Sequence, residues 1–373
     1  MKLTLKDGTV FEGKSFGANV PASGEVVFNT GMVGYVESLS DPSYAGQILV
    51  LSYPLVGNYG VPSYAKASEG RPLKQPFESA RIQAAGLVVA EYSENYSHAD
   101  ARESLSEWLK RSKVPAITGV DTRALTKKLR EHGVMLGVID SKPESTARRR
   151  FAVSDFVDPN EENLVARVSI KKPETYGNGP MGLASAPVDC PTTIILVDCG
   201  MKENILRSLV RPETTIVRVP WDYDFTNDKY DGVVISNGPG DPTACEETIA
   251  NLRRAMISNK PILGICLGTQ LLALTAGATT YKLKYGHRSQ NQPCIDSETR
   301  RCYITSQNHG YAVDVKSLPS DWKVWFTNAN DGSVEGIKHR VKPWRAVQFH
   351  PEACPGPTDT AWIFDDFLKS LKK

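Results

Sequence analysis

A cysteine between two glycines is the most reactive candidate in the chain. It lies in the run Gly264-Ile265-Cys266-Leu267-Gly268. Apolar residues before the cysteine predict a short buried strand, and the residues after it predict a helix. A sharp turn from strand to helix leaves no room for Cβ atoms beside the central residue and exposes its side chain. The pattern therefore predicts that Cys266 is a nucleophile.

The same turn would supply groups that activate a thiol. Free N–H groups and the dipole at a helix N-terminus favour the thiolate of Cys266. The N–H of Leu267 would point toward a developing oxyanion. Gly238, in a Gly-Pro-Gly loop after another predicted strand, would bring a second N–H to that oxygen. The alternatives are a buried structural cysteine and a simple Gly-Pro turn, but the two flanking glycines argue against a structural role for Cys266.

A thiolate nucleophile needs a base and a group that orients the base. In the C-terminal half, His309 and His350 follow or end predicted strands. Glu352 lies two residues after His350, close enough to hold one imidazole tautomer. His309 has no carboxylate near it in the sequence, so we expect a structural or substrate-contact role for it. The alternative for His350 is a surface histidine at a strand end. The residues together predict acyl transfer through a Cys266–His350–Glu352 triad and a thioester.

Composition excludes several classes of function. The chain has 373 residues, of which 40% are hydrophobic and 23% charged, as in a globular protein large enough for two domains. A net charge of +2 gives no case for nucleic-acid binding. No apolar run is long enough to span a membrane. Neither a G-K-[ST] phosphate loop nor a G-x-G-x-x-G after a strand is present.

The cysteine pattern argues against cross-links and metal ligation. There are seven cysteines, an odd number, and no C-x-x-C pair. We therefore expect neither a disulfide framework nor a zinc site. A reducing, cytoplasmic location fits this pattern best.

The pattern of expected elements divides the chain in three. We predict a mixed α and β domain over residues 1–145, a linker over 146–191, and a second domain over 192–373. Continuous apolar strands that alternate with helices in the second domain predict an α/β fold with a doubly wound, mostly parallel sheet. Sites in such sheets lie beyond the carboxyl ends of the strands, so we expect Gly238 and Cys266 to converge.

Individual elements follow from local patterns. In residues 1–60, which we expect to be all-β with turns, Asp7-Gly8 predicts a hairpin. The other strands expected up to residue 191 cover 25–28, 48–51, 86–89, 136–139 and 164–170, and the helices cover 99–111 and 121–130. From residue 192 on, the expected strands cover 193–197, 215–219, 232–235, 261–265, 302–305, 334–337 and 344–349. The expected helices there cover 202–209, 243–256 (with a Thr243–Glu246 capping box), 271–276 and 359–371.

Three motifs in order resemble the triad class of glutamine amidotransferases: residues 264–268, the loop 236–242 and His350-Pro351-Glu352. The first domain resembles the small subunit of carbamoyl phosphate synthetase. The stretches that carry this second resemblance are 24–30, 41–44, 53–60 and 121–123. Residues 281–294 are most similar to the eukaryotic fused type of that synthetase. The chain is thus identified as a member of this family.

The resemblance implies a glutaminase without a cofactor or metal on this chain. Cys266 would attack the glutamine side-chain amide, His350 would transfer protons, and Glu352 would orient His350. The resemblance also implies a set of glutamine contacts. They are Ser43, Gly238, Gly240, Leu267, Gln270, Asn308, Gly310 and Tyr311.

The resemblance further implies a partner. Ammonia would pass to a large synthetase subunit or domain, separate or fused, which would hold ATP and a divalent metal. Carbamoyl phosphate from this reaction would serve pyrimidine or arginine biosynthesis, and the fused-type resemblance favours pyrimidines. Thr269 departs from the pattern, because the family usually has His there. Two alternatives stay open: a stand-alone cysteine hydrolase of another γ-glutamyl substrate, and a non-catalytic scaffold domain.

Overall fold

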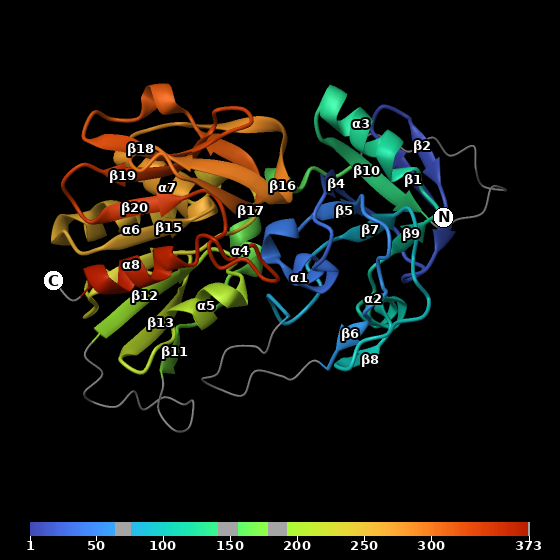
Figure 1. The fold of residues 1–373 in the computed structure, drawn as a ribbon, viewed down its shortest axis with the longest axis horizontal. Helices are drawn as coiled ribbons and strands as arrows, with labels where there is room; N and C mark the ends of the chain where they lie inside the picture. Colours follow the sequence, from blue (N-terminus) through green and yellow to red (C-terminus); the bar gives the residue numbers. More distant parts are fainter. Residues whose placement is uncertain (64–75, 141–155, 178–191, 372–373) are drawn as a thin grey trace. The chain divides into compact units, whose positions relative to one another are not determined.

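The computed structural model describes residues 1–63, 76–140, 156–177 and 192–371 (Figure 1). They fall into two compact units, of which unit 1 comprises Met1–Ala65 and Ser79–Glu162, and unit 2 comprises Lys66–Glu78 and Asn163–Lys373. The expected linker borders at 146 and 191 lie outside the described residues and stay predictions. No helix of the described residues has the length and apolar character needed to cross a membrane.

Unit 1 is built on a mixed sheet. Its described strands run in the order β2-β1-β10-β4-β5-β7-β9-β3, and four neighbours in this order, β4, β5, β7 and β9, are parallel. Their bounds are β1 Lys2–Leu5, β2 Val10–Glu12, β3 Lys14–Ser15, β4 Ala22–Asn29, β5 Gln47–Leu51, β7 Gly86–Val89, β9 Ala116–Thr118 and β10 Met135–Asp140. A separate ribbon pairs β6 Val61–Pro62 with β8 Ala101–Glu103. The predicted hairpin and the mixed α and β character are confirmed.

The helices of unit 1 show where local capping decides the boundaries. Asp121 accepts a hydrogen bond from the N–H of Ala124 at 2.8 Å and begins α3, as the sequence predicted. A capping box between Ser104 and Glu107 begins α2, so the helix expected from residue 99 starts later and β8 precedes it. The described helices are α1 Tyr35–Ser40, α2 Leu105–Arg111, α3 Thr122–His132 and the 3-10 turns η1 Pro42–Tyr44 and η4 Pro159–Glu161. The expectation that residues 1–60 are all-β was wrong at α1 and η1.

Unit 2 contains a longer sheet. Its described strands run in the order β11-β13-β12-β14-β15-β20-β19-β18-β16-β17. The strands from β13 to β20 in this order are parallel, and the strands beyond β20 extend the sheet antiparallel. Their bounds are β11 Glu174–Gly177, β12 Thr192–Asp198, β13 Thr214–Pro220, β14 Gly232–Ile235, β15 Ile262–Ile265, β16 Thr280–Asp296, β17 Cys302–Val313, β18 Trp322–Asn328, β19 Val334–His339 and β20 Trp344–Val347.

Helices cover both faces of the parallel strands. Alternate residues of β12 enter different cores: Ile194 packs with α5 and α8, and Ile195 packs with α6 and α7. The period of two along a strand explains this division. The helices are α4 Leu164–Val168, α5 Glu203–Leu209, α6 Glu246–Ala255, α7 Leu267–Ala276 and α8 Trp362–Ser370, with 3-10 turns η5 Pro242–Ala244, η6 Met256–Ser258 and η7 Val315–Ser317. The predicted doubly wound fold is confirmed.

Three local expectations in unit 2 were wrong. The strand expected over 164–170 is the helix α4, because the Asn163 side chain accepts a hydrogen bond from the N–H of Ala166 and caps a helix. The Thr243–Glu246 capping box does not form, since Thr243 lies in η5 and α6 starts after it. The strands β11, β16 and β18 were not expected. β16 is polar, and buried, half-buried and exposed residues are mixed along it, so its extended form depends on pairing with β17.

Candidate active site

Three parallel strands bring the predicted triad and loop to one edge of the unit 2 sheet. β14 pairs with β15, and β15 pairs with β20, in parallel register. Their carboxyl ends therefore lie at the same edge. Gly238 follows β14, Cys266 follows β15, and His350 follows β20. Strand order thus gathers residues that are more than 100 positions apart in the chain.

Cys266 occupies the tight bend between β15 and α7. Its backbone has φ 53° and ψ −104°, a conformation that non-glycine residues rarely adopt and that often marks functional sites. The bend also excludes neighbouring side chains. A Cβ on Gly264 would lie 2.5 Å from the Gly268 oxygen, and one on Gly268 would lie 2.3 Å from the Ile235 oxygen. The geometry is that of a nucleophile elbow.

The loop after β14 lies against this bend. A Cβ on Gly238 would lie 2.0 Å from the backbone oxygen of Cys199 and 2.8 Å from Cδ2 of Leu267. Glycine alone allows so close an approach. Gly238 and Leu267 therefore come together as the sequence analysis expected. Leu267 begins α7, so its N–H is in the first turn, where the helix offers no partner.

His350 and Glu352 form a buried pair. Nδ1 of His350 lies 2.6 Å from Oε1 of Glu352, and the two residues are 1% and 2% exposed. A carboxylate accepts, so Nδ1 donates its proton to Glu352, and Nε2 is the nitrogen left for proton transfer. Nε2 is buried and has no partner of hydrogen-bond geometry among the described residues.

Charges around the pair keep it ionised. Burial would lower the pKa of His350, but the carboxylate of Glu352 and the thiol of Cys266 raise this pKa to about 10. Burial would raise the pKa of Glu352, but Lys202 and His350 lower that pKa to about 2. Cys266 and His350 follow the paired strands β15 and β20, so both side chains belong to the same end of the sheet.

Lys202 is a site residue that the sequence analysis missed. Its Nζ lies 3.3 Å from Oε1 of Glu352 and 3.9 Å from Oε1 of Glu78, and all three residues are buried. Lys202 follows β12 at the same edge of the sheet. The only signal in the sequence was this position after a predicted strand.

The expected glutamine contacts other than Ser43 belong to unit 2, and Asn308 contacts Cys266. The thiol of Cys266 donates to the backbone oxygen of Asn308 at 3.7 Å. Nε2 of Gln270 donates to the backbone oxygen of Tyr311 at 2.9 Å and to Oε1 of Gln348 at 3.2 Å. Gln348 was not expected at the site. These contacts join α7 to β17.

The remaining expected contacts lie on β17, in the loop that contains Gly238, and in unit 1. Gly310 lies between Asn308 and Tyr311 on β17. Gly240 lies in the loop of Gly238 and has φ +85°, the left-handed region that favours glycine. Ser43 belongs to unit 1, where it lies in η1 and its N–H donates to Oδ1 of Asp41 at 2.8 Å.

Two protein families match the two parts of the chain. Residues 195–370 match the family model of the class-I glutamine amidotransferases, and residues 3–139 match the CPSase domain of the carbamoyl-phosphate synthase small chain. The chain is 53% identical over 373 residues to the arginine-specific carbamoyl phosphate synthase small chain of Aspergillus oryzae, an alignment that covers 99% of this chain and 80% of that protein. The chain belongs to the carbamoyl phosphate synthase small-chain family. The resemblance stated from sequence is confirmed.

Much longer relatives share this small-chain region. The chain is 49% identical to the multifunctional protein URA2 of Saccharomyces cerevisiae and 52% identical to the multifunctional protein CAD of Squalus acanthias, over 100% and 99% of its own length. It spans 17% and 16% of those two proteins. As a carbamoyl phosphate synthase small chain, it is a glutamine-hydrolysing enzyme. Small chains of this family work without a cofactor.

Proposed function

We propose that this chain hydrolyses L-glutamine to glutamate and ammonia at Cys266 and supplies the ammonia to a carbamoyl phosphate synthase large subunit or domain. One observation carries the assignment: the strained bend holds Cys266 beside a buried His350–Glu352 pair. A structural cysteine would need neither the bend nor an ionised pair.

The chemistry proceeds in two acyl-transfer steps. The Cys266 thiolate attacks the side-chain amide carbon; the C–S bond forms and the C–N bond breaks. His350, which holds the proton taken from the thiol, gives it to the departing ammonia. A water then gives a proton to His350 and attacks the thioester, so that glutamate leaves and the thiol is restored. Both oxyanions would accept hydrogen bonds from the N–H groups of Gly238 and Leu267.

Glutamine would be held by groups around this centre. On unit 2 they are Gly238, Gly240, Leu267, Gln270, Asn308, Gly310 and Tyr311. The hydrogen bonds of Gln270 to Tyr311 and Gln348 support this assignment, because they fix α7 against β17 next to Cys266. Ser43 would add a contact from unit 1.

The proposed partner performs the remaining chemistry. It would be a separate large subunit or a fused domain, and ATP and a divalent metal would bind there. The carbamoyl phosphate would serve arginine biosynthesis, pyrimidine biosynthesis or both, since relatives of the arginine-specific and multifunctional kinds match at similar identity. We place the chain in the cytoplasm because cysteines such as Cys199 and Cys245 are buried and free. We propose no nucleic-acid or membrane partner.

Ammonia release from glutamine, measured with and without the large subunit, tests the function. Cys266→Ser should lower the rate on the order of a thousandfold or more, because the nucleophile is lost. Cys302→Ser removes an exposed cysteine on β17 and should leave the rate unchanged. An unchanged rate in Cys266→Ser would show the assignment to be wrong.

Two further measurements separate the alternatives. Full turnover by the chain alone would favour a stand-alone hydrolase, whereas a rate that rises on addition of the large subunit supports the proposal. Mass spectrometry of the intact chain after an acid quench should reveal a glutamyl thioester on Cys266. If no thioester forms even with the partner present, the domain is a scaffold.

A further inference from the structure

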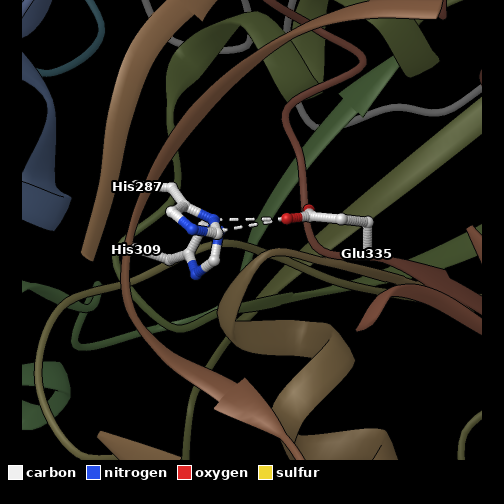
Figure 2. Close-up of side chains that lie close together, drawn as sticks. All are labelled: His287, His309 and Glu335. Carbon is white, nitrogen blue, oxygen red and sulfur yellow. Dashed lines mark ion pairs between the residues drawn. The ribbon is translucent and has the colours of Figure 1, made fainter. Parts of the chain in front are cut away.

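A second group of ligand-type side chains is buried on the antiparallel strands of unit 2. His287 lies on β16, His309 on β17 and Glu335 on β19, and one ligand atom of each lies within 4.8 Å of the others (Figure 2). Nδ1 of His287 is 3.3 Å from Oε1 of Glu335, and Nε2 of His309 is 3.9 Å from the same oxygen. The three residues are 9%, 4% and 0% exposed.

In each imidazole, the outer ring nitrogen, the one that points away from Glu335, already has a hydrogen-bond partner. Nε2 of His287 lies 2.9 Å from Oδ2 of Asp331, and Nδ1 of His309 lies 2.8 Å from the backbone oxygen of Tyr311. Both partner atoms are acceptors, so these two ring nitrogens carry the protons. Nε2 of His309 then faces Glu335 with a lone pair, and Nδ1 of His287 faces the same carboxylate. Metal-binding histidines are oriented in this way, by a carboxylate or carbonyl on the far nitrogen.

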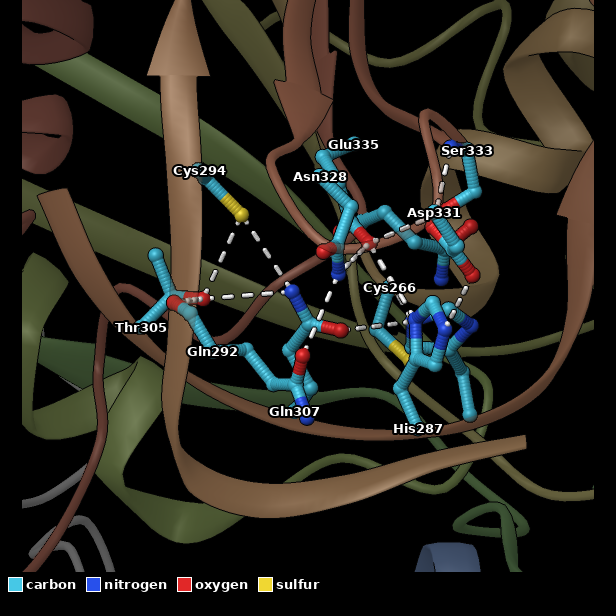
Figure 3. A network of polar contacts seen from close by, with 12 residues as sticks. Cys266, His287, Gln292, Cys294, Thr305, Gln307, Asn328, Asp331, Ser333 and Glu335 are labelled. Carbon is cyan, nitrogen blue, oxygen red and sulfur yellow. Dashed lines mark hydrogen bonds and ion pairs between the residues drawn. The ribbon is translucent and has the colours of Figure 1, made fainter. Parts of the chain in front are cut away.

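The carboxylate of Glu335 is also held by a hydrogen bond. Oε1 of Glu335 accepts from Nδ2 of Asn328 at 3.2 Å, and Oε2 is buried without a hydrogen-bond partner among the described residues. Oε1 of Gln307 lies 3.1 Å from Nε2 of His309. Figure 3 shows Gln307, Asn328 and Asp331 around the group. Several acceptor atoms therefore meet in a buried space, an arrangement that costs free energy unless a positive charge lies among them.

We propose that His287, His309 and Glu335 form a binding site for one divalent transition-metal ion of the zinc class. Two histidines and one glutamate are a known zinc donor set. Ligand atoms of a tetrahedral zinc site are about 3.3 Å apart, close to the 3.3 Å and 3.9 Å separations here. The amide oxygen of Gln307 offers a fourth ligand.

The ion would stabilise the wall of the active site and take no part in the reaction. His309 is the chain neighbour of Asn308, whose backbone oxygen accepts from the Cys266 thiol. An ion bound by the three residues would link β16, β17 and β19 behind this contact. The site rests on its own geometry, so its binding test is independent of the glutaminase assignment.

Metal titration of the full chain tests the proposal. We would use the Cys266→Ser chain, because Cys266 and His350 form a competing thiol–imidazole pair. After chelator treatment and removal of the chelator, the chain should bind one equivalent of Zn²⁺, measured by calorimetry and by metal analysis after gel filtration. Zn²⁺ should also raise the melting temperature. Absence of stoichiometric binding in this chain would overturn the proposal.

Variants locate the bound ion. In the same background, His287→Gln and Glu335→Gln should abolish stoichiometric binding. Asp331→Asn removes a partly exposed outer group, so the chain should fold, and Zn²⁺ affinity should fall about 10–100-fold. His339→Gln is the matched control, because His339 also contacts a carboxylate, that of Asp321, but lies outside the group. Equal affinity in Asp331→Asn and His339→Gln would place the ion elsewhere and refute the site, even if the His287 variant failed to fold.

Discussion

Nζ of Lys202 lies 3.3 Å from Oε1 of Glu352, the same oxygen that lies 2.6 Å from Nδ1 of His350. The three groups form a buried chain of cation, carboxylate and imidazole. Lys202 reaches the imidazole through the carboxylate of Glu352, which makes it a positioning residue.

Lys202→Met should lower the rate of ammonia release roughly tenfold, because Glu352 then orients and charges His350 less well. Lys202 lowers the pKa of Glu352, so its removal raises that pKa. The acidic limb of the kcat profile should therefore move to higher pH, with KM little changed. Lys316→Met, at an exposed position of η7, is the control. A pH profile that does not move in Lys202→Met would contradict the positioning role.

The ionised pair should also give unfolding a defined pH dependence. The pKa of Glu352 falls from 4.5 to about 2 on folding, so its contribution to stability is present above pH 4.5 and lost as the pH falls through 2. The pKa of His350 rises from 6.5 to about 10, so its contribution is present below pH 6.5 and lost as the pH rises through 10. Both contributions are complete between pH 4.5 and 6.5.

Urea unfolding of wild type and Glu352→Gln measures this effect. The difference in free energy of unfolding should be largest near pH 5.5 and should shrink as the pH rises toward 9.5. Glu298→Gln removes a surface carboxylate paired with Lys323 and Lys338, and its effect should stay nearly constant over this range. A Glu352→Gln difference that does not change with pH would show that the pair is not ionised in the folded chain.

The site residues that could be predicted from sequence lie at the carboxyl ends of parallel strands. β14, β15 and β20 are short and apolar, so each strand could be recognised alone, and the carboxyl-end rule then placed Gly238, Cys266 and His350 together. Glycines marked the bend because a Cβ cannot fit there. These signals are local or follow from strand direction.

The rest depends on which strands become neighbours. Lys202 reaches Glu352 from a different strand end, and no spacing in the sequence announces that contact. His287 and His309 are register partners across β16 and β17, but β16 is too polar to show a strand pattern. The expectation of no metal site considered only cysteine spacing, which carries no information about histidines and a glutamate from three strands.

Two glycines of the site should respond differently to alanine. Gly238→Ala places a Cβ 2.0 Å from the Cys199 oxygen, so it should cost about 1–3 kcal/mol or more and abolish ammonia release. At Gly310 the nearest atom to a Cβ is Nη2 of Arg288 at 3.5 Å, an ordinary contact. Gly310→Ala should therefore fold normally and raise KM for glutamine, since Gly310 is a proposed substrate contact.

Thermal unfolding and glutaminase kinetics measure both glycine effects. Gly177→Ala is the control, because a Cβ there would meet its nearest atom at 3.8 Å and the residue lies on β11. It should change neither stability nor KM. Normal stability and activity in Gly238→Ala would contradict the close packing of the loop after β14 and the role of its N–H.

Thr269 carries a buried hydroxyl next to the bend. It is 0% exposed, and its Oγ1 has no hydrogen-bond partner among the described residues. A buried polar group without a partner costs about 1–3 kcal/mol, so Thr269→Val, which keeps the shape, should raise the free energy of unfolding by about 1 kcal/mol. Ammonia release should stay near the wild-type rate, because no proposed step uses this hydroxyl.

The same helix offers the matched control for Thr269→Val. Thr275 is also buried on α7, but its Oγ1 donates to the Leu271 oxygen at 2.7 Å. Thr275→Val should therefore lower the free energy of unfolding by about 1 kcal/mol, the opposite sign. Urea unfolding of the two variants compares them directly. Equal losses in both would mean that the Thr269 hydroxyl has a hydrogen-bond partner in solution and would contradict the expected gain in stability.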